Sequence, residues 1–175
     1  MAQSDASATE TGTAKVARAY FDAIAAHDAE AVGASYEPGA VDRMVGMAEL
    51  RAPEEVREWF TRLFAAVPDV GIEVLDLVVE GDRAAVRWRS RGTFDGTGTF
   101  EGVAPTGASL EVEGFDLLTV REGKIVSNQA YLNGMDMARQ MGAMPPAGSI
   151  ADRGMLAAFN ARTAARDRIR ELLDR

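Results

Sequence analysis

The chain has 175 residues, of which 47% are hydrophobic and 26% charged, a composition typical of one globular domain that can bury a core and a ligand pocket. Its 27 acidic and 19 basic residues give a net charge of -8, which disfavours nucleic acid and anionic membranes as partners. The absence of cysteine and the presence of a single histidine exclude disulfides, thiolate metal sites, cysteine nucleophiles and histidine-rich metal sites.

The first 13 residues are polar and lack the apolar core of a secretory signal, so we expect a disordered leader over residues 1–13. No apolar run approaches the ~20 residues that span a bilayer, which predicts a cytoplasmic protein without a membrane segment. From about Ala14 a helical period appears, with Val16, Tyr20 and Ile24 on one stripe. Tyr20 is therefore expected on the buried side of a helix.

Two shorter helices are predicted next. Asp28 is expected to cap a helix that runs to Tyr36 and is ended by residues 37–39. A short strand and a loop follow over residues 40–50, and they contain Asp42. Pro53 opens a third helix whose apolar side carries Val56, Trp59, Phe60, Leu63 and Phe64.

From Ile72 onward the apolar period is two, which predicts strands over residues 72–79 and 84–94 and a long hairpin over residues 110–133. Trp88 and Phe94 share one face of the second strand, whereas a row of arginines on the other face can pair with acids of the neighbouring strand: Arg87, Arg89 and Arg91 with Glu111 and Glu113. Helices followed by strands predict an α+β fold, with a curved antiparallel sheet wrapped over three helices.

The end of the chain is predicted to be helical again. One helix is expected over residues 135–141, and a last helix starts at Ser149, where Ser149 and Asp152 form a capping pattern. We expect this last helix to pack on its own domain, with contact to a partner subunit as the alternative.

The hairpin carries the most informative acid, Asp116. Residues 121–123 suit a three-residue turn closed by Val120 opposite Lys124. Asp116 then lies on the more apolar face, which it shares with Val126, Asn128, Ala130 and Leu132. Because a lone buried carboxylate is costly, Asp116 is either structural and hydrogen-bonded or held for function.

Several segments resemble the nuclear transport factor 2-like superfamily: Ala19-Tyr20-Phe21 through His27-Asp28 to Tyr36, the loop over residues 102–107, Glu122-Gly123-Lys124-Ile125, and Arg139-Gln140-Met141-Gly142. The last three look most like its branch of SnoaL-like polyketide cyclases. The resemblance covers residues 14–145 and implies a cone-shaped α+β fold and a homodimer. Residues 146–175 are left as a C-terminal helical extension.

At the hairpin the chain is also similar to the ketosteroid isomerases. Asp116 stands where that family keeps a protonated aspartic acid, and Tyr20 where it keeps a second donor; the pair implies an oxyanion hole. The family's general base falls at Met44, so Asp42, two residues earlier, is the candidate base. The acid/base aspartate of the SnoaL-like cyclases falls at Ala130.

Two classes of function follow from these resemblances. The first is a metal-free and cofactor-free isomerase or cyclase that enolises a hydrophobic ketone or polyketide-like small molecule. Tyr20 and Asp116 would stabilise the enolate and Asp42 would move the proton, unless Asp116 is ionised and is itself the base. The substrate-binding residues would be Trp88, Phe60, Phe94, Asn128, Tyr36 and Met44.

The second class is a non-catalytic small-molecule-binding domain of the same fold, which is suggested by Ala130, Asn133 and Met44 at positions where relatives carry acids. A cyclase that acts by shape alone lies between the two classes. The structural alternatives are a core residue for Tyr20 and a solvated loop acid for Asp42. His27 is expected to be an exposed turn residue.

Overall fold

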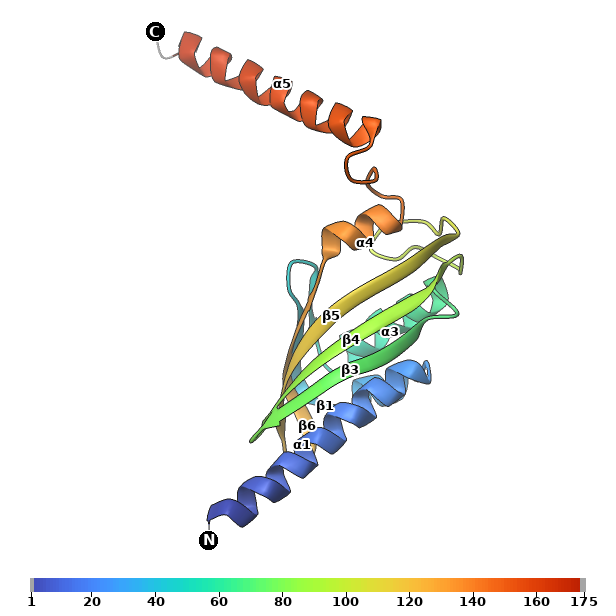
Figure 1. Cartoon of the computed structure of the whole chain (residues 1–175), viewed down its shortest axis with the longest axis vertical. Coiled ribbons are helices and arrows are strands. Elements are labelled where there is room, and N and C mark those ends of the chain that lie inside the picture. Colours follow the sequence, from blue (N-terminus) through green and yellow to red (C-terminus); the bar gives the residue numbers. More distant parts are fainter. Residues whose placement is uncertain (1, 174–175) are drawn as a thin grey trace.

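A six-stranded curved sheet, in the order β2-β1-β6-β5-β4-β3, forms the body of the protein in the computed structural model (Figure 1). The structure describes residues 2–173 and the side chains of residues 12–170. The elements are α1 (Ala2–Ala25), α2 (Ala29–Ala34), β1 (Tyr36–Met44), β2 (Ala48–Arg51), α3 (Glu54–Ala66), β3 (Gly71–Glu80), β4 (Arg83–Phe94), β5 (Ala108–Arg121), β6 (Lys124–Leu132), α4 (Gly134–Gln140) and α5 (Ile150–Leu173). The expected α+β class is confirmed.

Two helix boundaries differ from the sequence prediction. Helix α1 begins at Ala2, so the start expected near Ala14 is too late, and the leader expected over residues 1–13 is helical backbone from Ala2 onward; Met1 lies outside the described residues. Helix α2 is capped by Asp28, whose Oδ1 accepts a hydrogen bond from the Ala31 N–H at 2.9 Å, but it ends at Ala34. Tyr36 therefore belongs to β1.

Strand β1 includes residues 37–39, the segment that was expected to end the preceding helix. Pro38 has no N–H to give to a neighbouring strand, and it falls where the register of β1 against β6 shifts, between Tyr36 and Val41. Beyond that shift β1 pairs with β6 in parallel, so the expectation of an entirely antiparallel sheet is wrong at this one pair. The parallel register places Asp42 beside Asn128.

The hairpin of β5 and β6 turns more tightly than expected. Arg121 pairs with Lys124, and the two residues between them, Glu122 and Gly123, both have positive φ, at 48° and 76°. Such a two-residue turn matches the twist of the strands, which explains why the expected three-residue turn is wrong. A bulge between Thr119 and Val120 then moves Ile125, instead of Val126, onto the buried face.

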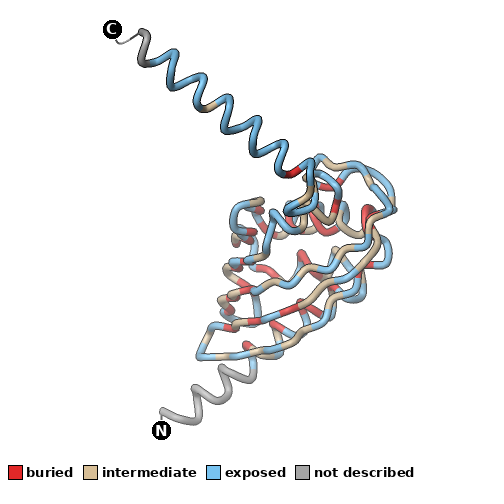
Figure 2. The backbone as a smooth tube through the Cα atoms, turned by 45° about the horizontal axis from the view of Figure 1, so that its top comes forward, coloured by how far each residue is buried: buried red, intermediate tan, exposed pale blue. Residues whose placement is uncertain are grey.

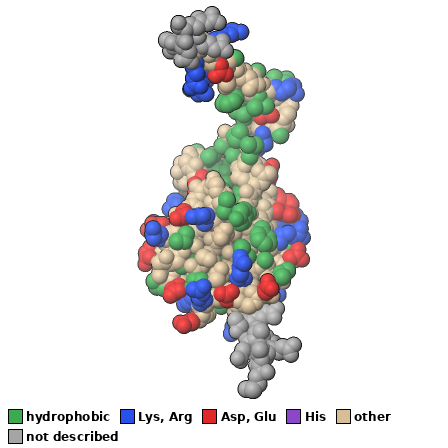
Figure 3. Space-filling view, turned by 90° about the vertical axis from the view of Figure 1, so that its left-hand side faces the viewer, with side chains coloured by type: hydrophobic (Ala, Val, Ile, Leu, Met, Phe, Trp, Pro, Cys, Tyr) green, Lys and Arg blue, Asp and Glu red, His purple; other side chains and the backbone are tan. Residues whose placement is uncertain are grey.

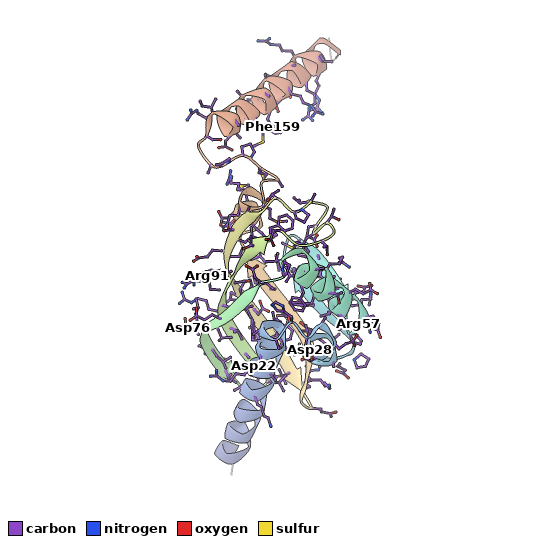
Figure 4. All side chains as sticks on the ribbon, turned by 90° about the vertical axis from the view of Figure 1, so that its right-hand side faces the viewer. Asp22, Asp28, Arg57, Asp76, Arg91 and Phe159 are labelled. Carbon is purple, nitrogen blue, oxygen red and sulfur yellow. The ribbon has the colours of Figure 1, made fainter. Side chains whose placement is uncertain are left out.

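Beyond the bulge, the hairpin faces are as predicted. Asp116 pairs with Ala130, Leu118 pairs with Asn128, and all four side chains are buried. The outer face carries the expected ion pairs, Arg89 to Glu113 at 2.6 Å and Arg91 to Glu111 at 2.9 Å. In Figure 4 the labelled Arg91 and Asp76 lie on one side of the sheet, and Asp28 and Arg57 on the other. The sheet therefore separates a charged outer face from the helix-covered interior.

Helix α5 projects away from the sheet beyond α4 (Figure 1), and almost all of its described length is exposed (Figure 2). Its start is fixed as predicted, because the Asp152 N–H donates to Ser149 Oγ at 3.1 Å. The expectation that it packs on its own domain is wrong: the Phe159 side chain is 66% exposed, and further apolar side chains follow the helix in Figure 3. Leu156 and Ile169 on the same helix are likewise exposed. Among residues 2–173 no helix has the length and apolar character needed to cross a membrane.

Gly96 is required where the loop after β4 crosses the end of α3. The N–H groups of Gly96 and Thr97 donate to the carbonyls of Ala66 and Ala65 at 3.0 and 2.7 Å, and a Cβ on Gly96 would lie 1.9 Å from the Ala65 oxygen. We expect Gly96→Ala to lower the free energy of unfolding by about 3 kcal/mol in urea titrations, because backbone must move to accommodate the methyl group. Gly12→Ala, where nothing lies within 4 Å, is the control; an equal loss in both variants would contradict this role.

Candidate active site

A cavity lies between helices α1 and α3 and the inner face of the sheet. Most of its wall is apolar, and a few polar side chains converge at one end, which is the usual character of a small-molecule site. Its lining comprises Tyr20, Phe21 and Ile24 from α1, Trp59, Phe60 and Leu63 from α3, and Asp42, Met44, Val70, Ile72, Trp88, Ser90, Asp116, Asn128, Ala130 and Leu132 from the sheet and its approach.

Asp116 lies at the polar end and is only 4% exposed. Both of its oxygens accept hydrogen bonds, Oδ1 from Trp88 Nε1 at 2.8 Å and Oδ2 from Asn128 Nδ2 at 2.9 Å. Burial outweighs these bonds and, with the nearby charge of Asp42, raises the pKa of Asp116 from 3.8 to about 7. This carboxyl can therefore keep its proton close to neutral pH.

Asp42 is the second acid of the cavity, and its side chain is fully buried. The alternative of a solvated loop acid is wrong, because the residue lies within β1. The Tyr36 hydroxyl donates to Oδ2 at 2.8 Å, whereas Oδ1 has no hydrogen-bond partner among the described residues. Burial raises the pKa of Asp42 to about 6, and the nearby Tyr36 and Asn128 partly oppose the shift. Asp42 therefore ionises only as the pH approaches neutral.

Tyr20 and Tyr36 connect the two acids. Their hydroxyl oxygens lie 3.3 Å apart, and Asn128 Nδ2, which donates to Asp116, is 3.5 Å from the Tyr36 hydroxyl. Burial raises the pKa of Tyr20 well above its ordinary range, and the charges of Asp42 and Asp116 add to the effect. Tyr20 therefore remains a neutral hydroxyl that can donate.

The structure brings most of the sequence-predicted site residues to this cavity: Tyr20, Asp42, Met44, Phe60, Trp88, Asp116 and Asn128. Tyr36 supports Asp42 without lining the cavity. Phe94 is buried but is not part of the lining, and its carbonyl accepts hydrogen bonds from the Thr106 and Gly107 N–H groups. His27 lies in a turn, as expected, but it is half-buried and its ring stacks on Phe64 at 4.8 Å, so the expectation that it is exposed is wrong.

Sequence reasoning missed several contributions to the site. Trp59 and Phe21 form part of the wall; Trp59 lay on the predicted apolar side of its helix, and Phe21 follows the predicted buried Tyr20. The polar role of Trp88 was missed entirely, although Gly114, its partner across the strands, offered a signal. A Cβ on Gly114 would lie 2.2 Å from Trp88 Cζ2, so only glycine leaves room for the indole in this position.

The cavity continues into a second apolar pocket towards α4. The two pockets share Trp59, Leu63, Val70, Trp88, Ser90 and Leu132, and the outer one adds Met47, Val67, Arg91, Gly92, Phe100, Leu110, Val112, Met137 and Met141. A wider, open groove elsewhere is lined by Asp69, Arg91, Thr93, Glu111 and Gln140, which bond to one another and leave no orphaned buried group. In the part of the chain that the structure describes, no three His, Asp or Glu side chains converge as a metal site would require. Asp42 and Asp116 are the carboxyl groups of the inner cavity's lining.

The raised pKa of Asp42 implies a stability that depends on pH. The carboxyl ionises near pH 3.8 in the unfolded chain and near pH 6 in the folded protein. The free energy of unfolding therefore falls as the pH rises through this window, and the loss reaches its full size above it. We expect the free energy of unfolding of Asp42→Asn, relative to that of the wild type, to be about 2 kcal/mol higher at about pH 7.5 than at about pH 4.5. Urea unfolding at both pH values measures this difference. Asp22→Asn, on the exposed side of α1, is the control; a gain that is equal at both pH values would contradict the shift.

Gly114→Ala tests the position of the Trp88 indole. The added methyl group must displace the indole, and we expect the pKa of Asp116 to rise further above 7 because a hydrogen bond that favours the ionised form is lost. A carboxyl NMR titration of Asp116 measures the shift. Gly134→Ala, where nothing lies within 4 Å, is the control. An unchanged titration in folded Gly114→Ala would show that Trp88 does not set this pKa.

Comparison with known proteins shows the family of this chain. The family model for SnoaL-like polyketide cyclases matches residues 14–141. A provisionally named SnoaL-like polyketide cyclase from Jannaschia sp. CCS1 has 23% identity and a TM-score of 0.69, over 78% of this chain and 96% of its own. AclR from Streptomyces galilaeus, provisionally named a hydroxylase, has 22% identity and a TM-score of 0.68, over 92% and 98%.

IdmH from Streptomyces antibioticus, provisionally named a polyketide cyclase, has 27% identity and a TM-score of 0.62, over 74% of this chain and 98% of its own. No curated protein shows significant similarity to the chain. The family match spans most of the chain and includes both strands that carry the buried acids. The chain therefore belongs to the family of SnoaL-like polyketide cyclases.

Proposed function

We propose that this protein is an isomerase or cyclase that enolises a hydrophobic ketone or polyketide-like small molecule with its own acid and base groups. The observation that supports this most directly is the pair of buried carboxyls in one apolar cavity, of which one keeps an unpartnered oxygen. Two acids whose surroundings separate their pKa values are the usual means by which a protein has an acid and a base available together.

Asp42 is the proposed base. Its side chain belongs to the lining of the cavity, its buried Oδ1 has no hydrogen-bond partner among the described residues, and a pKa of about 6 leaves it ionised at neutral pH. It would take a proton from the carbon beside the substrate carbonyl, and the electron pair of that C–H bond would move into the enolate.

Asp116 and Tyr20 are the proposed donors to the enolate oxygen. Asp116 has the higher pKa of the two acids, about 7, and Tyr20 stays protonated because of its burial. Donors fixed in an enclosed site stabilise the developing negative charge without reorganisation. Asp42 would then return the proton to a different carbon of the conjugated enolate, which is an isomerisation. Alternatively, the enolate carbon would attack a second carbonyl carbon of the same molecule, and the oxygen of that carbonyl would take up the proton from Asp42, which closes a ring.

The shape of the cavity supports an apolar substrate with one polar end. The acids lie at one end of the lining, whereas the adjoining pocket is lined by methionine, leucine, valine and phenylalanine side chains. IdmH is named a polyketide cyclase, and extended apolar molecules with several carbonyls suit such a space.

The proposal is tested by isomerisation and deuterium exchange with a panel of β,γ-unsaturated ketones. We expect kcat/KM to fall by about 10²- to 10⁴-fold in Asp42→Asn and by about 10²-fold in Tyr20→Phe and Asp116→Asn. The pH profile should be bell-shaped: activity falls below about pH 6 as Asp42 gains a proton, and above about pH 7 as Asp116 loses one.

Asp152→Asn, a buried aspartate outside the cavity, is the matched control and should retain activity. Unchanged rates in both Asp42→Asn and Asp116→Asn, with folding verified by circular dichroism, would contradict enolisation by these acids. The fold would then serve binding or shape-directed cyclisation.

A further inference from the structure

At the polar end of the cavity, two lining side chains each have an acceptor oxygen that is buried and not used by the described residues. Asp42 Oδ1 and Asn128 Oδ1 belong to side chains that are at most 1% exposed, and neither has a hydrogen-bond partner among the described residues. Both side chains line the cavity. Because an unsatisfied buried acceptor is costly, these atoms point to a ligand that brings hydrogen-bond donors.

The same end of the cavity lacks a positive charge. Its lining contains two aspartates and neither lysine, arginine nor histidine. Arg91 lines the adjoining outer pocket but not this cavity, and its guanidinium is paired with Glu111 at 2.9 Å. The groups that face the two acids are Tyr20 from α1, Tyr36 from β1, Trp88 from β4 and Asn128 from β6, and all of these are neutral. An ionised acid there has no cationic partner within the cavity.

Aromatic rings complete the surroundings. Tyr20, Phe60 and Trp88 line the cavity beside the acids, and Phe21 and Trp59 extend the wall. Aromatic faces attract cations, most strongly when water is excluded. Acids, free acceptors and aromatic faces together are a set that a protonated amine satisfies and a simple hydrocarbon ketone does not.

We infer that the ligand of this cavity carries a protonated amine next to its reacting carbonyl, with an apolar remainder in the outer pocket. This rests on the proposed function in placing the reacting carbonyl at the same acids. The ammonium group would donate to Asn128 Oδ1 and neutralise the charge of Asp42. Asp42 Oδ1 then lies beside the carbon that carries both the amine and the carbonyl, and the adjacent positive charge makes that C–H bond more acidic.

Calorimetric binding to the full chain at about pH 7.5 tests the inference with two probes of similar shape, benzylamine and benzyl alcohol. We expect benzylamine to bind at least about tenfold more tightly, because only the ammonium pairs with the cavity's charge. Benzyltrimethylammonium, which has no N–H group, should bind more weakly than benzylamine. Asp42→Asn should remove most of the preference for benzylamine, whereas Asp152→Asn should keep it.

Equal or tighter binding of benzyl alcohol to the wild type would overturn the inference, and this comparison needs no variant to fold. An undiminished preference in folded Asp42→Asn would also overturn it. The inference and the proposed function can fail separately. Ketone turnover that depends on Asp42, without any preference for the amine, would contradict the inference and leave the proposed function intact. A preference for benzylamine without turnover of any ketone removes the enolisation mechanism and keeps the amine site.

Discussion

Two carboxyl groups buried in one apolar cavity are the constraint on which the rest of the site depends. Each would be costly to bury as an isolated charge. The surrounding strands supply neutral hydrogen-bond donors to the two carboxyl groups: an indole from β4, an amide from β6 and a hydroxyl from the start of β1. Neutral donors lower the cost without removing it, so both pKa values stay raised. A cationic side chain in place of these donors would have stabilised the ionised forms and left no acid that keeps its proton near neutral pH.

The strand pairing of the sheet brings these groups together. The parallel pairing of β1 with β6 places Asp42 beside Asn128, and the antiparallel pairing of β5 with β6 places Leu118 beside Asn128 and Asp116 beside Ala130. Asn128 therefore lies between the strands that carry the two acids and can influence both. The bulge near the hairpin turn sets this alignment, because a shift of one residue would turn Asn128 to the outer face.

Alternation along the strands was sufficient to predict much of this architecture. The face of Trp88, the outward arginines and the inward Asp116 follow from a period of two, and the local capping of α2 and α5 follows from Asp28 and Ser149. The burial of Asp42 could not be predicted this way, because Pro38 and Gly39 disguise the start of β1 and its partner strand lies far along the chain. The Trp88 to Asp116 hydrogen bond likewise depends on a rotamer that only the space above Gly114 permits.

Ala130 shows why the acids of this chain lie on β1 and β5 instead of on the second arm of the hairpin. It pairs with Asp116 on one side and with Met44 on the other, so it lines the cavity from the strand between those that carry the two acids. A carboxylate at this position would place a third negative charge directly beside Asp116, in a lining that has no cation. The methyl group of Ala130 adds no charge to the lining. The small residue at position 130 and the acid at position 42 are thus two parts of one arrangement, in which a single pair of carboxyls faces the ligand.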